Sequence, residues 1–267
     1  MNVTLITGAS GGIGEALASR LAARKHNLLL VARNAGKLEQ QCRQFAQAYG
    51  ISAQYIAADL SKAGAPQQVF EEAQARGLEV DMLINNAGIG SGGAFSELLL
   101  KDELALLQLN NASLVAMTHL FLLPMQARGS GTIINVASMA AFIPFPYMAT
   151  YAASKAFVRS FTQAITEECK PYGIHVMLLC PGLTRTNFNR AAGIENNEKS
   201  KGLNIEYSST TQTPEQVADE AIRALDRKKH VIVSGRMNRL AANLSALLPN
   251  AIVARGFARS YRKRTGK

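Results

Sequence analysis

The stretch that decides the fold is Thr7-Gly8-Ala9-Ser10-Gly11-Gly12-Ile13-Gly14, which directly follows the apolar run Val3–Ile6. Behind it, Ile13, Leu17 and Leu21 recur at the spacing of a helix. A glycine-rich turn between a strand and a helix lets a pyrophosphate approach backbone N–H groups at a positively polarised helix N-terminus. We therefore predict a cofactor-binding turn, whose contributing residues are Gly8, Ser10, Gly11, Gly12, Ile13 and Gly14.

The alternation of short apolar runs and amphipathic segments continues along the chain. The expected strands are residues 3–7, 28–32, 53–57, 82–85, 132–136, 175–179 and 231–233. The expected helices are residues 12–25, 35–49, 66–75, 102–125 and 150–170, with another that opens at 213–215. Strands that alternate with helices require crossover connections, so the pattern predicts an α/β fold with one doubly wound parallel sheet covered by helices on both faces. We expect one catalytic domain over residues 1–235, with a long polar substrate loop at 187–213.

Composition excludes several classes of protein. The chain has 267 residues, of which 48% are hydrophobic, and this balance does not fit disordered, collagen-like or disulfide-scaffold proteins. The first residues lack the pattern of a secretory signal, and no apolar run reaches the roughly 20 residues of a membrane span. The three cysteines are far apart and lack ligand spacing, so we predict a cytoplasmic protein without disulfides or a metal site.

The second strand ends at Arg33, where a dinucleotide fold meets the adenosine ribose. An acidic residue would suit the 2′-hydroxyl of NAD, whereas a guanidinium suits a 2′-phosphate. The sequence thus favours NADP(H) over NAD(H). The alternative is that Arg33 is only a solvated charge in a loop and contacts no cofactor. Asp59 and Leu60 suit the adenine edge, with an ordinary loop aspartate as the alternative for Asp59. The small residues of Asn86-Ala87-Gly88 lie where a cofactor binds in open α/β sheets.

At this point the chain resembles the short-chain dehydrogenase/reductase family over residues 3 to about 233. The motifs that carry the resemblance occur in one order: Thr7-Gly8-x-x-x-Gly12-x-Gly14, Asn85-Asn86-Ala87-Gly88, Asn110, Ser138, Tyr151-x-x-x-Lys155 and Pro181-Gly182. The resemblance implies strand order 3-2-1-4-5-6-7 in a single domain, and a homodimer or homotetramer.

The chemistry of these residues suits transfer of a hydride to a carbonyl, which needs a proton donor beside the developing alkoxide. Tyr151 and Lys155 are four residues apart, so they share one helix face, and a nearby ammonium favours the phenolate. By resemblance, Tyr151 is the acid/base, Lys155 lowers its pKa and holds the nicotinamide ribose, and Ser138 binds the substrate oxygen. Asn110 would anchor the water chain that resupplies the proton.

Two positions depart from a simple match. Asn110 is followed by Asn111, so either asparagine can be the family's helix residue, and counting toward Met125 favours Asn110. After Pro181 and Gly182, the resemblance adds Thr184 to the cofactor site and places Thr186 near the nicotinamide carboxamide. A helix N-cap is the alternative role for Thr186.

The residues expected around the substrate are mostly apolar: Phe95, Met139, Phe142, Ile143, Phe145, Tyr147, Met148, Phe188 and Ile194. They favour an apolar ketone, aldehyde, 3-oxoacyl or steroid-like substrate over a small polyol. The predicted function is an NADPH-dependent carbonyl reductase, with a catalytically idle NADP(H)-binding sensor or scaffold as the alternative.

The excess of basic over acidic residues is confined to the end of the chain. The net charge is +10, yet residues 227–267 contain 11 of the 29 basic residues and none of the 19 acidic ones. Residues 236–267 therefore form a basic extension, with two amphipathic helices predicted at 237–248 and 251–261. Such helices suit peripheral membrane contact through 236–264. A subunit contact, a cover over the substrate cleft, and a patch for an acyl-carrier protein or coenzyme A remain alternatives, and without a recognised module we expect no nucleic acid.

Overall fold

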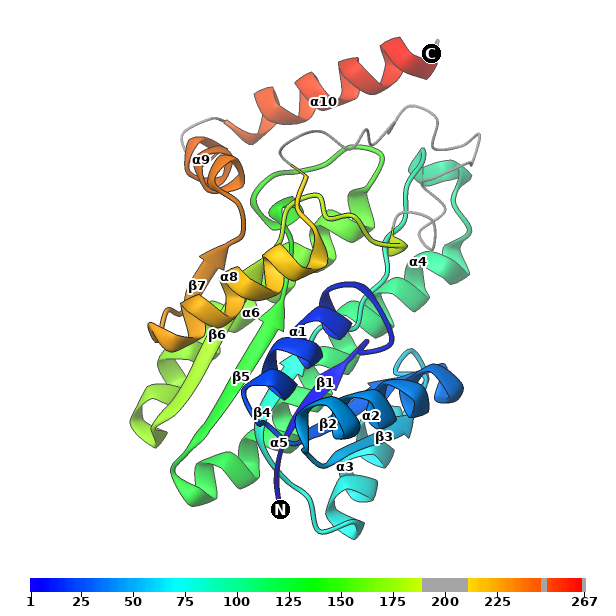
Figure 1. The fold of residues 1–267 in the computed structure, drawn as a ribbon. Helices are drawn as coiled ribbons and strands as arrows, with labels where there is room; N and C mark the ends of the chain where they lie inside the picture. The colour runs from blue at the N-terminus through cyan, green and yellow to red at the C-terminus, as the bar shows by residue number, and fades with distance from the viewer. Residues whose placement is uncertain (189–210, 246–248, 266–267) are drawn as a thin grey trace.

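The computed structural model describes residues 1–188, 211–245 and 249–265. Its centre is a seven-stranded parallel sheet in the order β3-β2-β1-β4-β5-β6-β7, which confirms the predicted fold and strand order (Figure 1). The strands are β1 Asn2–Thr7, β2 Leu28–Ala32, β3 Ala53–Ala57, β4 Glu79–Asn85, β5 Gly131–Val136, β6 Ile174–Cys180 and β7 Val231–Val233. Strands β1, β2, β5 and β6 form close to their predicted bounds because their runs of Val, Ile and Leu are buried between two helical layers. In contrast, β4 begins three residues before its predicted start, and the edge strands β3 and β7 are only partly buried.

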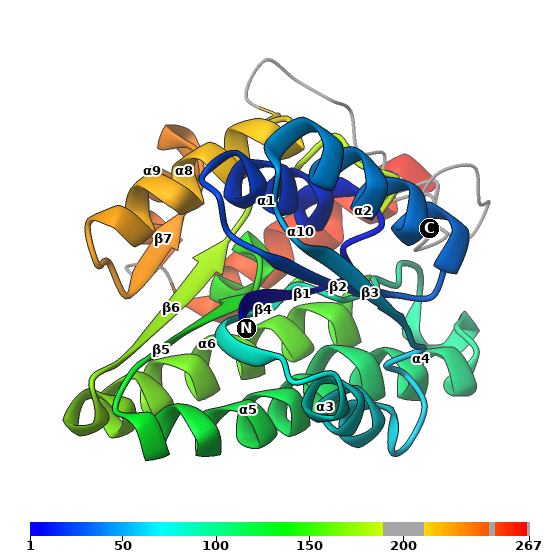
Figure 2. The same cartoon turned by 60° about the horizontal axis from the view of Figure 1, so that its bottom comes forward.

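The helices form a layer on each face of the sheet. They are α1 Gly12–Ala23, α2 Ala35–Tyr49, α3 Ala65–Ala75, α4 Leu100–Leu107, α5 Leu114–Arg128, α6 Ala149–Cys169, α8 Pro214–Asp226, α9 Arg236–Ser245 and α10 Asn250–Thr265. Short helical turns lie at η1 Phe95–Glu97, η2 Gln108–Ser113, η3 Met139–Phe142 and η4 Lys170–Tyr172. Helices α1, α2 and α8 cover one face, and α3, α5 and α6 cover the other (Figure 2).

The order of the strands reverses between β1 and β4, which are hydrogen-bonded neighbours although two strands, β2 and β3, separate them in the chain. In an open parallel sheet, the crevice beyond the carboxyl ends of two such strands is where ligands bind. Thr7 ends β1 and Asn85 ends β4. The topology therefore brings the glycine-rich turn and the Asn86-Ala87-Gly88 segment together.

The helix predicted at 102–125 is longer than expected and contains a turn of a different helical type. It runs continuously over Leu100–Arg128, and a π-helical turn at Gln108–Ser113 separates α4 from α5. By length and hydropathy this stretch passes the test for a membrane span. In this fold, however, Met117, Phe121 and Met125 are buried in the core cluster on one face of the sheet. We therefore describe it as a core helix of the domain.

A buried polar network joins the centre of the sheet to α5 and α6. The Asn85 side-chain amide donates to Thr118 Oγ1 and to Asn135 Oδ1, each at 2.9 Å. Asn135 in turn donates from Nδ2 to Thr162 Oγ1 at 3.0 Å, and its side chain is completely buried. Because each of these groups is shielded from water, removal of one partner leaves another unsatisfied.

We predict that Asn135→Ala lowers the free energy of unfolding by about 2–3 kcal/mol, since it leaves the Asn85 amide short of an acceptor and Thr162 short of a donor. Urea unfolding followed by circular dichroism measures the change. The control is Asn243→Ala on the exposed side of α9. Equal stability of the two variants would contradict the prediction.

Candidate active site

Hydrogen bonds from Thr7 and Asn86 fix the glycine-rich turn to the end of β4. Thr7 Oγ1 accepts from the backbone N–H groups of Asn86 and Ala87, each at 3.0 Å, and donates to the carbonyl of Ile84 at 3.3 Å. The Asn86 side-chain amide donates to the carbonyls of Thr7 and Gly8 at 2.9 and 3.3 Å. The start of the turn thus has a fixed position relative to the fourth strand.

The glycines of the turn are required by its backbone and its close packing. Gly8 and Gly12 have positive φ values of 65° and 57°, a conformation that a β-carbon disfavours. A β-carbon on Gly14 would lie 2.4 Å from the Gly8 carbonyl oxygen. Helix α1 begins after Gly11 without a side-chain N-cap, so its first N–H groups face the turn without a protein side-chain acceptor. This cradle fits a phosphate group.

The predicted ribose and adenine contacts lie beside the turn. Arg33 is exposed after β2, and its positive charge helps to hold the pKa of Asp59 below its usual range. The largest cause of that lowered pKa is a hydrogen bond from Ser61, whose hydroxyl donates to Asp59 Oδ1 at 2.7 Å. Leu60 is buried among apolar side chains. Two of the three predicted residues therefore present charged groups at this edge of the sheet.

Ser138, Tyr151 and Lys155 meet at the carboxyl edge of β5. Ser138 follows β5 and accepts from the Ala140 N–H at 3.1 Å, which caps η3 and fixes the serine. The Ser138 hydroxyl is near enough to the Tyr151 phenol to lower the pKa of that phenol. Lys155 is buried one turn later on α6, and its ammonium donates to the carbonyl of Val136 at 3.0 Å. The sequence-predicted serine, tyrosine and lysine thus form one cluster.

Burial controls the protonation of this cluster. It raises the pKa of Tyr151, and the nearby Ser138 hydroxyl opposes that shift. Burial also lowers the pKa of Lys155 to about 8. The Lys155 ammonium lies 6.0 Å from the centroid of the Tyr151 ring. Among the chain's own groups, Tyr151 is therefore protonated at neutral pH, the form that can donate a proton.

The π-helical turn contains two neighbouring asparagines that have different hydrogen-bond partners. Asn110 is buried, accepts from the Ile89 N–H and donates to the Ile89 carbonyl, each at 2.9 Å. It also donates to Ser154 Oγ at 3.1 Å, and that hydroxyl donates to the carbonyl of Tyr151. Asn111 instead donates to the carbonyl of Ser154 at 2.9 Å. Only Asn110 reaches the segment that follows Gly88.

The segment after β6 lies against η3, which follows Ser138, and against the glycine-rich turn. The carbonyl of Pro181 accepts from the N–H of Met139, beside Ser138. Thr184 Oγ1 donates to the carbonyl of Gly182 at 3.0 Å. Thr186 Oγ1 accepts from the Phe188 N–H at 3.2 Å, a local cap, and its methyl group would be 3.1 Å from a β-carbon on Gly12. Ile194 and most of the loop predicted at 187–213 lie outside the described residues.

Apolar and aromatic side chains surround the catalytic tyrosine candidate. Tyr151 forms a cluster with Leu106, Met148 and Phe145, and its ring centroid lies 5.6 Å from that of Phe188. Of the other residues expected here, Phe142 packs instead with Arg159, and Phe95 is 63% exposed. The sequence offered a cover over the substrate cleft only as an alternative for the C-terminal helices, and it did not single out Phe257 and Tyr261, whose rings lie against Phe145 and Tyr147. Helix α9 meets the site where Asn238 packs against Gly182.

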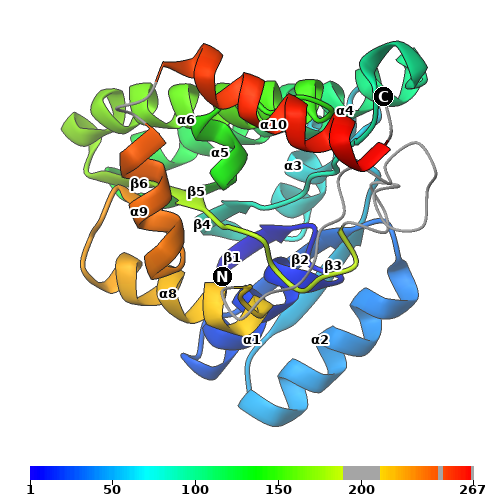
Figure 3. The ribbon, with the colours of Figure 1, turned by 90° about the horizontal axis from the view of Figure 1, so that it is seen from above.

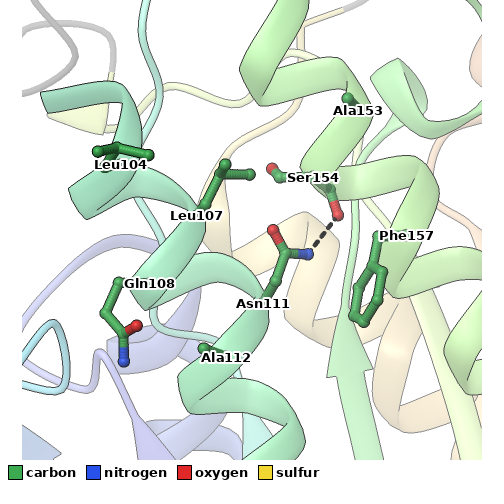
Figure 4. A pocket seen from close by; sticks show the side chains of 8 residues that line it. All are labelled: Leu104, Leu107, Gln108, Asn111, Ala112, Ala153, Ser154 and Phe157. Carbon is green, nitrogen blue, oxygen red and sulfur yellow. Dashed lines mark hydrogen bonds between the residues drawn. The ribbon is translucent and has the colours of Figure 1, made fainter. Parts of the chain in front are cut away.

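A hollow of about 550 Å³ lies elsewhere on the described part of the chain (Figure 4). It opens between α4, the π-helical turn and α6. Its lining residues are Leu104, Leu107, Gln108, Asn111, Ala112, Ala153, Ser154 and Phe157. Leu104 and Phe157 are about half exposed, at 56% and 44%. Neither Ser138 nor Tyr151 borders this hollow, so it is separate from the cluster described above.

Curated proteins of several kinds are similar to this chain. A dehydrogenase/reductase SDR family member 7B from Danio rerio is 31% identical, with 99% of this chain and 87% of that protein aligned. An NADP-dependent 3-hydroxy acid dehydrogenase from Schizosaccharomyces pombe is 30% identical over 86% and 89% of the two chains. A very-long-chain 3-oxoacyl-CoA reductase from Phaeosphaeria nodorum is 33% identical over 70% of this chain and 56% of that one.

Two of the solved structures to which the chain is similar are also dehydrogenases. A short-chain dehydrogenase from Sphingobium yanoikuyae in complex with NADPH superposes with a TM-score of 0.78 at 30% identity, over 87% of each chain. A bulky-bulky ketone specific alcohol dehydrogenase from Comamonas testosteroni gives 0.76 at 28% identity, over 92% of this chain and 93% of that one. The family model described as short chain dehydrogenase matches residues 2–197. The chain therefore belongs to the short-chain dehydrogenase/reductase family, whose members are oxidoreductases that use a nicotinamide cofactor on CH–OH and C=O groups.

Proposed function

We propose that the protein is an NADPH-dependent oxidoreductase that interconverts a carbonyl and an alcohol on an apolar substrate. The observation that carries the proposal is the meeting of Ser138, Tyr151 and Lys155 beside the glycine-rich turn. A β-carbon on Gly88 would lie 3.1 Å from Asn110 Oδ1 and 3.4 Å from Lys155 Nζ. The proposed cofactor site, which includes Gly88, therefore adjoins the proposed catalytic residues. The site has the groups of a working enzyme, which favours catalysis over an idle sensor or scaffold.

Each residue has a distinct task in the proposed reduction. The Ser138 hydroxyl and the Tyr151 phenol bind the substrate oxygen, and Tyr151 donates its proton as negative charge develops there. When bound, NADPH supplies the hydride. The buried Lys155 ammonium stabilises negative charge on the phenolate that remains and binds the nicotinamide ribose. Asn110, held by the Ile89 backbone, anchors the water chain that returns a proton.

The remaining contacts are assigned to the cofactor. The N–H groups at the start of α1 receive the pyrophosphate, with Ser10, Gly11, Gly12 and Ile13 around it. The other proposed contact residues follow later strands: Asp59 and Leu60 at the adenine, Asn86, Ala87 and Gly88 along the dinucleotide, and Pro181, Gly182, Thr184 and Thr186 toward the nicotinamide.

We predict that Tyr151→Phe lowers kcat/KM by about 10²- to 10⁴-fold, because it removes the proton donor while keeping the ring. NADPH binding, followed by its fluorescence, should stay unchanged. NADPH oxidation across a panel of apolar ketones measures turnover. The control is Tyr172→Phe, whose ring is 48% exposed on η4. Full activity of Tyr151→Phe would contradict the assigned role, and a wild-type protein that binds NADPH without turnover would favour the idle sensor.

Preference for NADP(H) over NAD(H) rests on Arg33. Its guanidinium is exposed after the end of β2 and donates to no acceptor among the described residues, so its donors are available to a 2′-phosphate. The nearby carboxylate of Asp59 is engaged by Ser61. The neighbouring Asn34 caps α2 by accepting from the Lys37 N–H at 3.0 Å, which fixes the backbone beside Arg33.

We predict that Arg33→Ala weakens NADPH binding by about 10- to 100-fold, as expected when a charged hydrogen bond is lost. NADH binding should change little, because NADH has no 2′-phosphate. Fluorescence titration with both cofactors measures the two dissociation constants. Arg43→Ala on α2 is a matched control, since Arg43 is paired with Glu39 away from the turn. An equal loss for NADH and NADPH would overturn the assignment.

The substrate is proposed to be an apolar ketone, aldehyde, 3-oxoacyl or steroid-like compound. The apolar cluster at Tyr151 supports this class, because a polyol would need polar partners. The names of the 3-oxoacyl-CoA reductase and of the bulky ketone alcohol dehydrogenase are consistent with it.

We also propose a cytoplasmic homodimer or homotetramer. The hollow between α4 and α6 supports a subunit contact, because exposed Leu104, Leu107 and Phe157 border it (Figure 4). Burial of such apolar side chains is a main driving force of association.

Residues 236–267 are proposed to form an extension of the catalytic domain, with peripheral membrane contact through 236–264. Three apolar residues, Met237, Leu240 and Leu244, are half exposed on one side of α9. On α10 the exposed residues include Arg255, Arg259 and Arg262. Exposed apolar groups beside basic ones suit an anionic lipid surface.

We predict that the triple variant Arg255→Glu, Arg259→Glu, Arg262→Glu binds vesicles of increasing anionic lipid content at least about 100-fold more weakly than wild type, at roughly 1 kcal/mol per charge. Sedimentation with the vesicles measures binding. The matched control reverses Arg43, Arg76 and Lys170, which are exposed on the body of the domain. Equal sedimentation of the two triple variants, or none for wild type, would remove the proposed membrane contact.

A further inference from the structure

Helix α10 has a second, aromatic side that faces the protein. Phe257 and Tyr261 are four residues apart, so both lie on the same face of the helix. Tyr261 is only 6% exposed, although the helix follows the last strand and lies at the edge of the domain. The burial of this ring shows that α10 packs against the protein.

The two aromatic side chains contact the segment that leads into the catalytic helix. The Phe257 ring centroid lies 4.6 Å from that of Phe145, with the planes inclined by 40°. Tyr261 stacks on Tyr147 with centroids 3.4 Å apart and planes at 12°. Two successive turns of α10 thus contact two residues that alternate along one loop. Such aromatic pairs contribute energy beyond the area they bury.

The contacted loop is part of the site. Phe145 packs against the cluster that contains Tyr151, and Tyr147 precedes Tyr151 by four residues. The view from above shows α10 over the layer that contains α5 and α6 (Figure 3), and Figure 1 shows it at the end of the molecule toward which the strands point. The helix therefore lies on the side of the molecule from which a substrate must approach Tyr151.

Tyr147 needs support from its surroundings. Its φ is +67°, a left-handed conformation that is uncommon for a bulky residue. The Gly93 N–H donates to the Tyr147 carbonyl at 2.8 Å, and Tyr261 covers the Tyr147 ring. Strained residues of this kind persist where contacts on several sides hold them. Helix α10 supplies one of these contacts.

We propose that α10 forms the outer wall of the substrate site, with Phe257 and Tyr261 as specificity-determining residues that limit the size of the apolar substrate. The inference rests on the proposed function, because it assigns a wall to that same site. Phe257 is 39% exposed and Tyr261 is buried, so Phe257 borders the entrance and Tyr261 closes the wall behind it. The basic residues of α10 remain available on its outer side.

The first test measures how substrate size affects turnover. In Phe257→Ala and Tyr261→Ala, the ratio of kcat/KM for a steroid-like ketone to that for a small aliphatic ketone should rise by about tenfold, because the wall recedes. The conservative single variants Tyr261→Phe and Phe257→Tyr should keep the wild-type ratio, since each retains an aromatic ring at that position. Ile252→Ala is the control, because Ile252 is 57% exposed on the same helix. An unchanged ratio in both alanine variants would overturn the proposal.

The second test needs no turnover. Acrylamide quenches the fluorescence of a reduced nicotinamide cofactor bound to the protein, and the quenching constant should rise at least about twofold in the two alanine variants as water gains access to the site. The constant should stay at the wild-type value in Ile252→Ala. Unchanged quenching would refute the wall even if the enzyme reduces ketones, whereas increased quenching without turnover of any ketone would support the wall and refute the proposed reaction.

Discussion

The site depends on the hydrogen bonds of one threonine. Thr7 Oγ1 uses its full capacity, donating to the carbonyl of Ile84 and accepting from the N–H groups of Asn86 and Ala87. These bonds join the end of β1 to the end of β4 at the point where the strand order reverses. The glycine-rich turn is held between them, and Gly14 leaves no space for a side chain. The position of the glycine-rich turn is therefore set by these hydrogen bonds between the two strand ends and by the close packing at Gly14.

Catalytic geometry follows from the same sheet edge. Strand β5 delivers Ser138, and the carbonyl of Val136 near its end accepts from the Lys155 ammonium. Helix α6 delivers Tyr151 and Lys155 on one face. The buried network of Asn85, Asn135 and Thr162 connects this helix to the strands that hold the turn. Because the network is shielded from water, it resists movement of α6 relative to the sheet.

The sequence was sufficient to predict the regular part of the structure, because that part depends on local patterns. Apolar runs such as Leu28–Ala32 and the amphipathic segment Ala35–Tyr49 have the predicted bounds. The convergence of Ser138, Tyr151 and Lys155 also agrees with the spacing of the motifs. The π-helical turn at Gln108–Ser113 was not predictable, since nothing in the apolar pattern distinguishes it from an ordinary helical turn, yet the hydrogen bonds of this turn show that Asn110 rather than Asn111 binds the Ile89 backbone. Nor does helical periodicity reveal whether Phe257 and Tyr261 face solvent, lipid or the protein, and the structure turns them toward Phe145 and Tyr147.

The central claim is that the site transfers a hydride from NADPH to a carbonyl carbon. The most direct measurement uses NADPH that carries deuterium in the transferred position of the nicotinamide, an apolar ketone, and mass spectrometry of the product. The account predicts an alcohol with one deuterium at the carbinol carbon and the stoichiometric formation of NADP⁺. An alcohol without the label, or no alcohol from any apolar ketone while NADPH remains bound, would contradict it.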